Sequence, residues 1–276
     1  MEISIITVTK NRKDILLNKL ESIQNQSLDK SLFELILLNN NSTDGTKEAL
    51  NNLNFNYKIK LIDSDIDLPV TKARNLCVQA ANAKYLYFSD DDCILEADVL
   101  EQHLAAQKKQ PCVSLGAIIF EDDSAAKWQP FAKYWYTNGA NTTVPKQAFE
   151  LVGGFDEDLK SYGLEDLLLG YELGLKNLAF VVLPEAVVHH IGKSPLTGHD
   201  LSKAYSAGQN SVIVTKKYPE LKFRLGITNW LLWFKKILYL SPLQIISKRF
   251  VENFDYERVY LMAVLEQKQI MEEKDV

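Results

Sequence analysis

The chain has 276 residues, of which 46% are hydrophobic and 24% are charged, a balance that excludes a disordered or collagen-like protein. The net charge is −5 and no long basic run is present, so we do not expect a nucleic-acid partner. The three cysteines stand at unrelated spacings, which argues against a disulfide framework or a structural zinc site.

The first part of the chain alternates short apolar runs with segments of helical spacing. The apolar runs predict strands at residues 3–8, 35–38, 58–62 and 85–88. Helical spacing of apolar residues predicts helices at residues 15–23 and 71–83. Strands that alternate with helices are typical of an α/β fold with a mostly parallel, doubly wound sheet.

This alternation stops near Val113. A further apolar strand is followed by an irregular acidic and aromatic loop, and a glycine-rich turn comes later, at residues 153–156. The pattern then predicts a helix at residues 165–175 and a short strand at 179–183. Beyond Gly192 the sequence is helical and amphipathic, and it contains no internal repeat.

Polar clusters follow three of the predicted strands. They are residues 9–12 (TKNR), 39–42 (NNNS) and 90–92 (DDD). Ligands of doubly wound sheets bind beyond the carboxyl ends of the strands, so these clusters form the candidate site. The asparagines are also compatible with a simple turn, in which Ser42 caps a helix that carries Asp44 in its first turn.

The acidic triplet Asp90, Asp91 and Asp92 is the strongest of these clusters. In an extended strand Asp90 and Asp92 point to one side, about 6.6 Å apart. Two charges at that distance repel by roughly 2.5 kcal/mol at an effective dielectric near 20, a cost that Mg²⁺ or Mn²⁺ would offset. The alternative is a solvated acidic turn that caps a helix starting near Leu95.

The motifs together resemble the family-2 glycosyltransferases of the GT-A fold. The resemblance covers roughly residues 3–192. It rests on residues 3–12, 38–46 (LNNNSTDGT), 73–75 (ARN), 90–92 (DDD), 138–141 (NGAN), 152–157 (VGGFDE), 165–166 (ED) and 184–190. Asn210 and residues 217–219 (KYP) resemble the helical tail of bacterial polysaccharide members.

The resemblance implies a GT-A domain at residues 1–192 and a helical C-terminal extension at residues 193–276. Within the GT-A domain, residues 1–112 would form the half that binds a nucleotide sugar, and residues 113–192 would form the acceptor half.

The same resemblance implies a metal site for Mn²⁺ or Mg²⁺. Asp92 would be the direct ligand, with Asp90 facing the metal, ribose or phosphate, and a histidine would complete the site. Neighbouring residues on a strand point opposite ways, so only one of His189 and His190 can face the metal, and we expect His190. A packed or solvated histidine is the alternative at this place.

The resemblance also implies contacts to the donor, which is a nucleoside diphosphate sugar. The residues concerned are Thr9, Asn11, Arg12, Asn40, Arg74, Asp90 and Asp91. This sequence departs from the family in having Val8 where proline is usual and Asn39-Asn40 where aspartates are commoner. The choice among UDP, dTDP and GDP therefore stays open, and Arg74 is also compatible with a surface position on its helix.

For the acceptor, the resemblance implies that Asp166 is the general base and that Glu165 orients the attacking hydroxyl. Without the family context, Glu165 and Asp166 are also explained as favourable charge in the first turn of a helix.

These residues together lead us to expect a metal-dependent, inverting glycosyltransferase. It would transfer a sugar to a saccharide or lipid-linked saccharide acceptor, with surface polysaccharide biosynthesis as the setting. One alternative is a catalytically silent relative that binds nucleotide or acts as a scaffold. Another is a nucleotidyltransferase, which the lack of glycine in residues 9–12 disfavours.

The N-terminal residues show no signal-peptide pattern, so we expect a cytoplasmic protein. Residues 230–234 (WLLWF) lie near several basic residues, and this tail can be either a packed helix pair or a peripheral contact with the inner face of the membrane. The basic residues concerned are Lys222, Arg224, Lys235, Lys236, Lys248 and Arg249.

Overall fold

The computed structural model describes residues 1–121, 127–128, 130–191, 200–241, 248 and 253–274. It divides into two compact units. The first unit contains Met1–Glu157 and Glu165–Ser194, and the second contains Asp158–Leu164 and Pro195–Val276.

Four parallel strands form one half of the sheet in the first unit, in the order β3-β2-β1-β4. They are β1 (Ile3–Thr9), β2 (Phe33–Asn40), β3 (Lys58–Ser64) and β4 (Tyr85–Phe88). All four strands predicted for this region are confirmed. Because the strands are parallel, the polar residues that follow them gather at one edge of the sheet.

The other half of the sheet is mixed. Strand β8 (Thr142–Pro145) lies antiparallel between β4 and β6 (Cys112–Phe120), and β9 (Ala179–His190) runs parallel to β6. Two short strands, β5 (Cys93–Leu95) and β7 (Lys127–Trp128), pair antiparallel with β9 and β6. The predicted strand at 179–183 therefore continues to His190.

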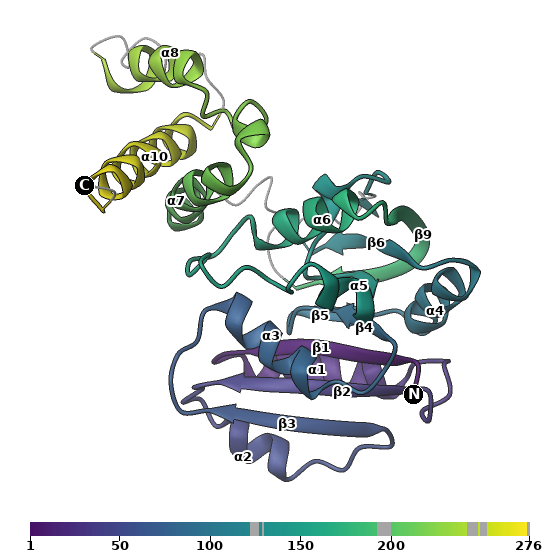
Figure 1. Cartoon of the computed structure of the whole chain (residues 1–276). Helices are drawn as coiled ribbons and strands as arrows, with labels where there is room; N and C mark the ends of the chain where they lie inside the picture. The colour runs from purple at the N-terminus through teal and green to yellow at the C-terminus, as the bar shows by residue number, and fades with distance from the viewer. Residues whose placement is uncertain (122–126, 129, 192–199, 242–247, 249–252, 275–276) are drawn as a thin grey trace. The chain divides into compact units, whose positions relative to one another are not determined.

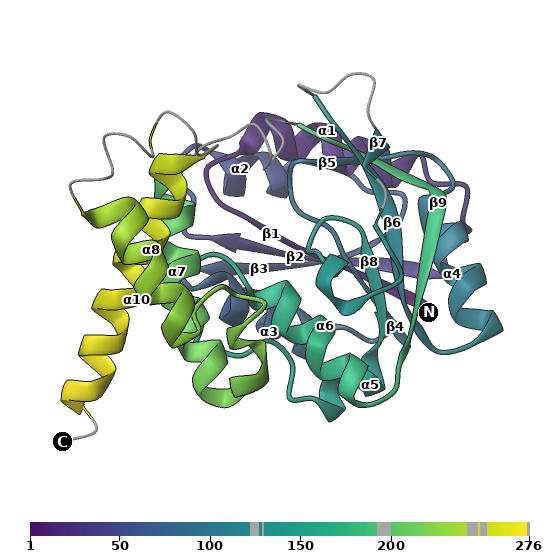
Figure 2. The same cartoon turned by 90° about the horizontal axis from the view of Figure 1, so that it is seen from above.

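Helices cover both faces of this sheet, as expected for a doubly wound fold (Figures 1 and 2). On one face lie α1 (Lys13–Gln24), α2 (Thr46–Asn51) and α4 (Val99–Lys109). On the other face lie α3 (Val70–Ala80), α5 (Lys146–Leu151) and α6 (Glu165–Leu175). Adjacent strand residues point to opposite faces, so Ile5 belongs to the first core and Ile6 to the second.

Two details of the sequence interpretation are wrong. Ser42 caps no helix: α2 begins at Thr46, whose backbone N–H donates to Asp44 Oδ1 at 3.1 Å. No helix starts near Leu95 either, because residues 93–95 pair with β9 and α4 begins only at Val99. Strand β9 lies far along the chain, so the local sequence carries no sign of this pairing.

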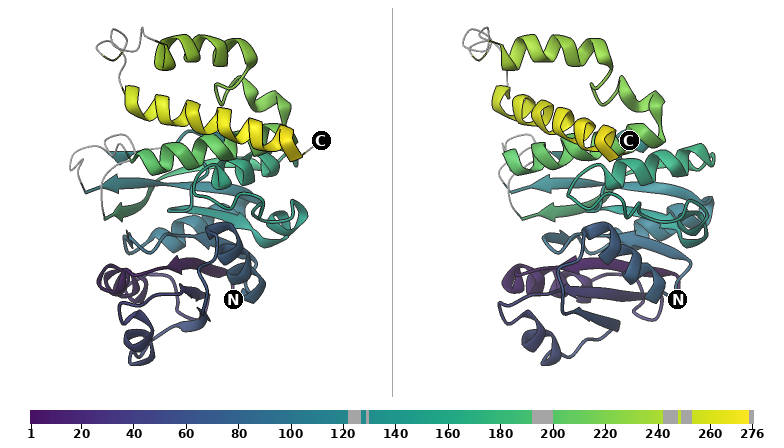
Figure 3. Two further views of the ribbon diagram at one scale, coloured as in Figure 1. Left: turned by 90° about the vertical axis from the view of Figure 1, so that its left-hand side faces the viewer. Right: turned by 60° about the vertical axis from the view of Figure 1, so that its left-hand side comes forward.

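The second unit is helical. It contains α7 (Leu201–Lys217), the 3₁₀ turn η2 (Pro219–Lys222), α8 (Asn229–Leu240) and α10 (Phe254–Lys274). Helix α10 lies between α7 and α8 (Figure 3). Their shared core includes Val212, Leu232 and Leu261. Among the described residues, no helix has the length and apolar character needed to span a membrane.

Candidate active site

The loops after β1 and β2 are tied together at the carboxyl edge of the sheet. The backbone N–H of Asn11 donates to Ser42 Oγ at 2.9 Å, and Asn11 Oδ1 accepts from the Thr43 N–H at 2.7 Å. Asn11 has a φ of +52°, a left-handed conformation that asparagine tolerates better than most residues. Asn11 therefore shapes one wall of the site by holding two loops in register.

The acidic triplet lies in the turn between β4 and β5, so the spacing of Asp90 and Asp92 in an extended strand does not apply here. Asp91 and Asp92 share one partner: Arg12 Nη1 lies 2.9 Å from Asp91 Oδ1 and 2.6 Å from Asp92 Oδ2. Asp90 faces a different cation, with 2.7 Å between its Oδ1 and Arg74 Nη2. The turn therefore directs its three carboxylates toward two arginines: Arg12 in the loop after β1 and Arg74 on α3.

The surroundings shift the acidities within this turn in opposite directions. Burial raises the pKa of Asp90, but Arg74 and other nearby cations lower it, and the net shift is downward. Burial raises the pKa of Asp91 overall, although Arg12 and a 2.8 Å hydrogen bond from Thr9 Oγ1 favour its charged form. Asp90 is therefore the more strongly ionised of the two.

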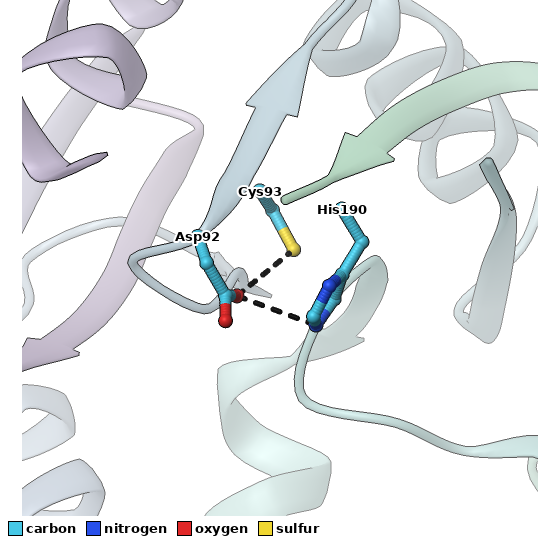
Figure 4. Close-up of side chains that lie close together, drawn as sticks. All are labelled: Asp92, Cys93 and His190. Atoms are coloured by element: carbon cyan, nitrogen blue, oxygen red, sulfur yellow. Dashed lines mark hydrogen bonds and ion pairs between the residues drawn. The ribbon is translucent and has the colours of Figure 1, made fainter. Parts of the chain in front are cut away.

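His190 lies beside this turn because β9 ends next to β5 (Figure 4). Its Nε2 is 3.4 Å from Asp92 Oδ1, and the Cys93 Sγ approaches the same oxygen at 3.8 Å. His189 points away and pairs with Glu96 at 3.1 Å. The side chain of His190 is 22% exposed, compared with 50% for His189.

The donor atoms of Asp92 and His190 fit a divalent cation. The 3.4 Å separation is long for a hydrogen bond, and the buried Nδ1 of His190 has no hydrogen-bond partner in the described part of the chain. Carboxylate oxygen and imidazole nitrogen both suit Mn²⁺, and the carboxylate suits Mg²⁺. Cys93 completes a cluster within 4.8 Å, and burial raises the pKa of its thiol.

Arg74 connects the acidic turn to α6. Besides its contact with Asp90, its Nη1 lies 3.0 Å from Asp166 Oδ1 and 3.6 Å from Glu165 Oε1. The Arg74 side chain is only 8% exposed, so its interpretation as a surface residue was wrong. A Cβ at Gly139 would lie 2.1 Å from Arg74 Nη2, and glycine at that position therefore leaves room for the guanidinium.

Asp166 is held by Arg74 and by the backbone N–H of Gly139, which donates to its Oδ2 at 2.9 Å. Burial raises the pKa of Asp166 to about 7, against the effect of Arg74 and with the help of the charges on Glu165 and Asp90. The Asp166 side chain remains 23% exposed. A reachable carboxylate that titrates near neutrality is suited to proton transfer.

The side-chain amide of Asn40 is hydrogen-bonded to the loop before α3. Its Nδ2 donates to the Leu68 carbonyl and its Oδ1 accepts from the Leu68 N–H, both at 2.9 Å. Asn39 donates to Asp63 at 3.0 Å, while its buried Oδ1 has no hydrogen-bond partner among the described residues. Neither asparagine caps the next helix. Asn40 positions the loop before α3, and only Asn39 keeps an uncommitted polar atom.

Lys19 is a residue that the sequence interpretation missed. Its side chain is completely buried beneath the acidic turn, where Nζ donates to Ser89 Oγ at 2.6 Å and to the Cys93 carbonyl at 3.4 Å. Burial lowers the pKa of Lys19, and the three aspartates oppose that shift. The available signal was a lysine on the buried face of its helix, three residues after Leu16 and four before Ile23.

The model of the family "Glycosyl transferase family 2" matches residues 4–160, which is more than half of the chain. The chain therefore belongs to glycosyl transferase family 2.

Validoxylamine A glucosyltransferase from Streptomyces hygroscopicus subsp. limoneus is 24% identical over 230 residues, covering 67% of this chain and 50% of the relative. The chain spans about half the length of the curated relatives that it matches first.

Two solved structures have the same fold. Mannosyltransferase PcManGT from Pyrobaculum calidifontis, in complex with GDP-Man and Mn²⁺, has a TM-score of 0.65 at 16% identity, covering 97% of this chain and 87% of its own. S. aureus TarS 1–349, in complex with UDP, has a TM-score of 0.63 at 17% identity, covering 98% and 92%. The expected α/β fold of the GT-A type is thereby confirmed.

Proposed function

We propose that this chain is a metal-dependent, inverting glycosyltransferase that uses a nucleoside diphosphate sugar. The observation that carries the proposal is the position of Arg74. One buried guanidinium joins Asp90 of the acidic turn, at 2.7 Å, to Asp166 at the start of α6, at 3.0 Å. The contacts of Arg74 support a proposed donor site that lies next to the proposed proton acceptor, as a one-step transfer between two substrates requires.

The donor diphosphate binds, in this proposal, at the carboxyl edge of the sheet. Arg12 and Arg74 supply positive charge there, and a guanidinium matches phosphate oxygens in a bidentate manner. Thr9, Asn11 and Asp91 lie at this same edge of the sheet. Structures with this fold hold UDP in TarS and GDP-Man in PcManGT, which supports a UDP-, dTDP- or GDP-linked donor here.

Asp92 and His190 would hold Mn²⁺ or Mg²⁺, with Asp90 beside them. Such an ion, when bound, offsets the negative charge that develops on the departing nucleoside diphosphate. The structure with GDP-Man and Mn²⁺ supports this ion as a partner of the fold.

Asp166 acts as the general base. It removes the proton of the acceptor hydroxyl while that oxygen attacks the anomeric carbon from the side opposite the diphosphate. The new glycosidic bond forms as the old carbon–oxygen bond breaks, so the configuration at the anomeric carbon inverts. Glu165, next to Asp166 and 3% exposed, orients the acceptor.

The acceptor in this proposal is a saccharide or a lipid-linked saccharide, and the setting is surface polysaccharide biosynthesis at the cytoplasmic side of the membrane. This setting is supported by the resemblance of the segment around Asn210 to the helical tail of the bacterial polysaccharide members. Asn210 is buried in the second unit, and its Nδ2 donates to the carbonyls of Ser161 and Gly163 at 3.0 and 2.6 Å.

The test is donor turnover with a panel of UDP-, dTDP- and GDP-sugars, with Mn²⁺ and after chelation. We expect hydrolysis or transfer with one nucleotide class, lost on chelation and restored by Mn²⁺. Turnover that is indifferent to chelation would overturn the metal assignment. Binding of a nucleotide without turnover of any donor would instead favour the catalytically silent alternative.

A further inference from the structure

Helix α8 in the second unit carries large aromatic side chains on its outer side. Trp230 is 61% exposed, Trp233 is 66% exposed and Phe234 is 53% exposed. Phe223, in the segment before the helix, is 69% exposed. Large contiguous apolar patches are rare on soluble monomers, and Trp230, Trp233 and Phe234 share one side of α8 because they are three and four residues apart.

The packing of α8 within its own unit does not use these residues. Leu232 and Tyr239 are its buried side chains, with 5% and 6% exposure, and both belong to the core formed with α7 and α10. At 100° per residue, Trp230, Trp233 and Phe234 lie on the side of the helix away from Leu232 and Tyr239. The helix therefore has two apolar sides, of which only one is covered by the described residues.

The segment that carries these residues is basic, whereas α10 brings both Lys268 and Glu272 next to Trp233 and Lys236. Residues 221–241 contain no aspartate or glutamate, although the whole chain has a net charge of −5. Lys222 and Arg224, in the segment before α8, and Lys236, on α8, are exposed. Lys235 differs, because it is mostly buried and pairs with Glu257 at 3.0 Å. We call the exposed set the α8 face: Lys222, Phe223, Arg224, Trp230, Trp233, Phe234 and Lys236.

We propose that the α8 face is a docking surface for an anionic lipid bilayer. Tryptophan and phenylalanine side chains are suited to the boundary between headgroups and acyl chains, and lysine and arginine beside them to anionic headgroups. A second copy docked through the same face would bring like charges together, which disfavours a symmetric dimer.

The purpose of this docking rests on the proposed function, because a lipid-linked acceptor is presented at a membrane surface. The binding itself does not depend on it. Vesicle binding can be measured without donor, metal or acceptor, so a failure of lipid binding and a failure of the glycosyltransferase proposal are distinguishable.

The experiment is vesicle flotation of the full chain, with phosphatidylcholine alone and with phosphatidylcholine containing phosphatidylglycerol. We expect binding only to the anionic vesicles, weakening as salt is raised. The double variant Trp230→Ser/Trp233→Ser should weaken binding at least about tenfold. Lys222→Gln and Lys236→Gln should each weaken it about fivefold and reduce its salt dependence.

The matched control is Leu151→Ser on α5, because Leu151 is 66% exposed but lies in the first unit. Its vesicle binding should equal that of the wild type, and the thermal unfolding of all variants should be unchanged. Flotation that is absent, or that the double tryptophan variant does not reduce, would overturn the proposal. So would a dimer in light scattering that the same variant converts to monomer, because a second copy would then cover the face.

Discussion

The acidic turn and the α8 face differ in opposite ways from the usual pattern of buried apolar and exposed charged side chains. In the first unit, Asp91, Asp92 and Lys19 are charged groups removed from water. In the second unit, Trp230 and Trp233 are apolar groups left in water. Burial of charge and exposure of large aromatics both cost free energy. Each region is therefore better explained by the binding of a ligand than by folding alone.

The two regions differ in how far the protein itself offsets that cost. The acidic turn is surrounded by Arg12, Arg74 and Lys19, so its charges are balanced within the fold. The α8 face has no such compensation among the described residues, because its aromatic side chains remain exposed. Substitutions in the turn should therefore change stability and catalysis together, whereas substitutions on the α8 face should change lipid binding alone.

The largest effect is expected for Asp166→Asn. Loss of the proton acceptor should lower kcat by roughly 10²- to 10⁴-fold, because general base catalysis contributes that much. Donor affinity should stay the same, since Asp166 acts on the other substrate. Steady-state kinetics with nucleotide-binding titration measures both. Glu150→Gln, on an exposed acid of α5 that pairs with Lys146 at 3.7 Å, is the control. A collapse of donor affinity in Asp166→Asn would place this residue in the donor site instead.

Next in size is the stability effect of Lys19→Ala. Removing a fully buried cation from beneath three carboxylates should lower the free energy of unfolding by about 3 kcal/mol. Urea denaturation measures this directly. Trp233→Ser, by contrast, should change it by less than about 0.5 kcal/mol, because its side chain is exposed. Equal effects in the two variants would remove the distinction between the regions.

The two neighbouring histidines provide a matched pair for the metal site. His190→Gln should weaken Mn²⁺ binding by about 10- to 100-fold, measured by calorimetry in the presence of nucleotide. His189→Gln should leave it unchanged, because His189 faces Glu96. A stronger effect at His189 than at His190 would show that the strand presents the other side chain to the ion.

A further effect concerns pH. Because the pKa of Asp166 is raised from 3.8 to about 7, the folded state binds more protons than the unfolded state between these values. This contribution to stability is therefore complete below pH 3.8 and is lost as the pH rises through 7. Denaturation at several pH values should show this decline in the wild type and not in Asp166→Asn. Turnover should rise over the same pH range as Asp166 loses its proton; an unchanged rate from pH 5 to 8 would argue against Asp166 as the base.

Local patterns were sufficient for much of the fold. The strands of the parallel half and helix α6 follow from apolar runs and from helical spacing, which are properties of neighbouring residues. The strand at residues 93–95 could not be predicted, because its partner β9 lies about ninety residues further on. The resemblance identified the motifs, but their contacts depend on the packing of distant segments.

The candidate site, like the fold, could be predicted from the sequence only in part. The sequence indicated Asp90, Asp92 and Asp166 as chemically important residues, and the structure places Arg74 between Asp90 and Asp166. The internal hydrogen bonds of Asn40 and the burial of Lys19 were not predictable from residue type. Asparagine and lysine are usually exposed, and only the tertiary structure shows that these two are not.

The central claim is that Asp92 and His190 hold a divalent ion that also contacts the donor diphosphate. A crystal grown with Mn²⁺ and UDP, measured at the manganese absorption edge, tests it most directly. We expect an anomalous peak bonded to Asp92, His190 and a phosphate oxygen. Bound UDP with no manganese between these two side chains would contradict the account.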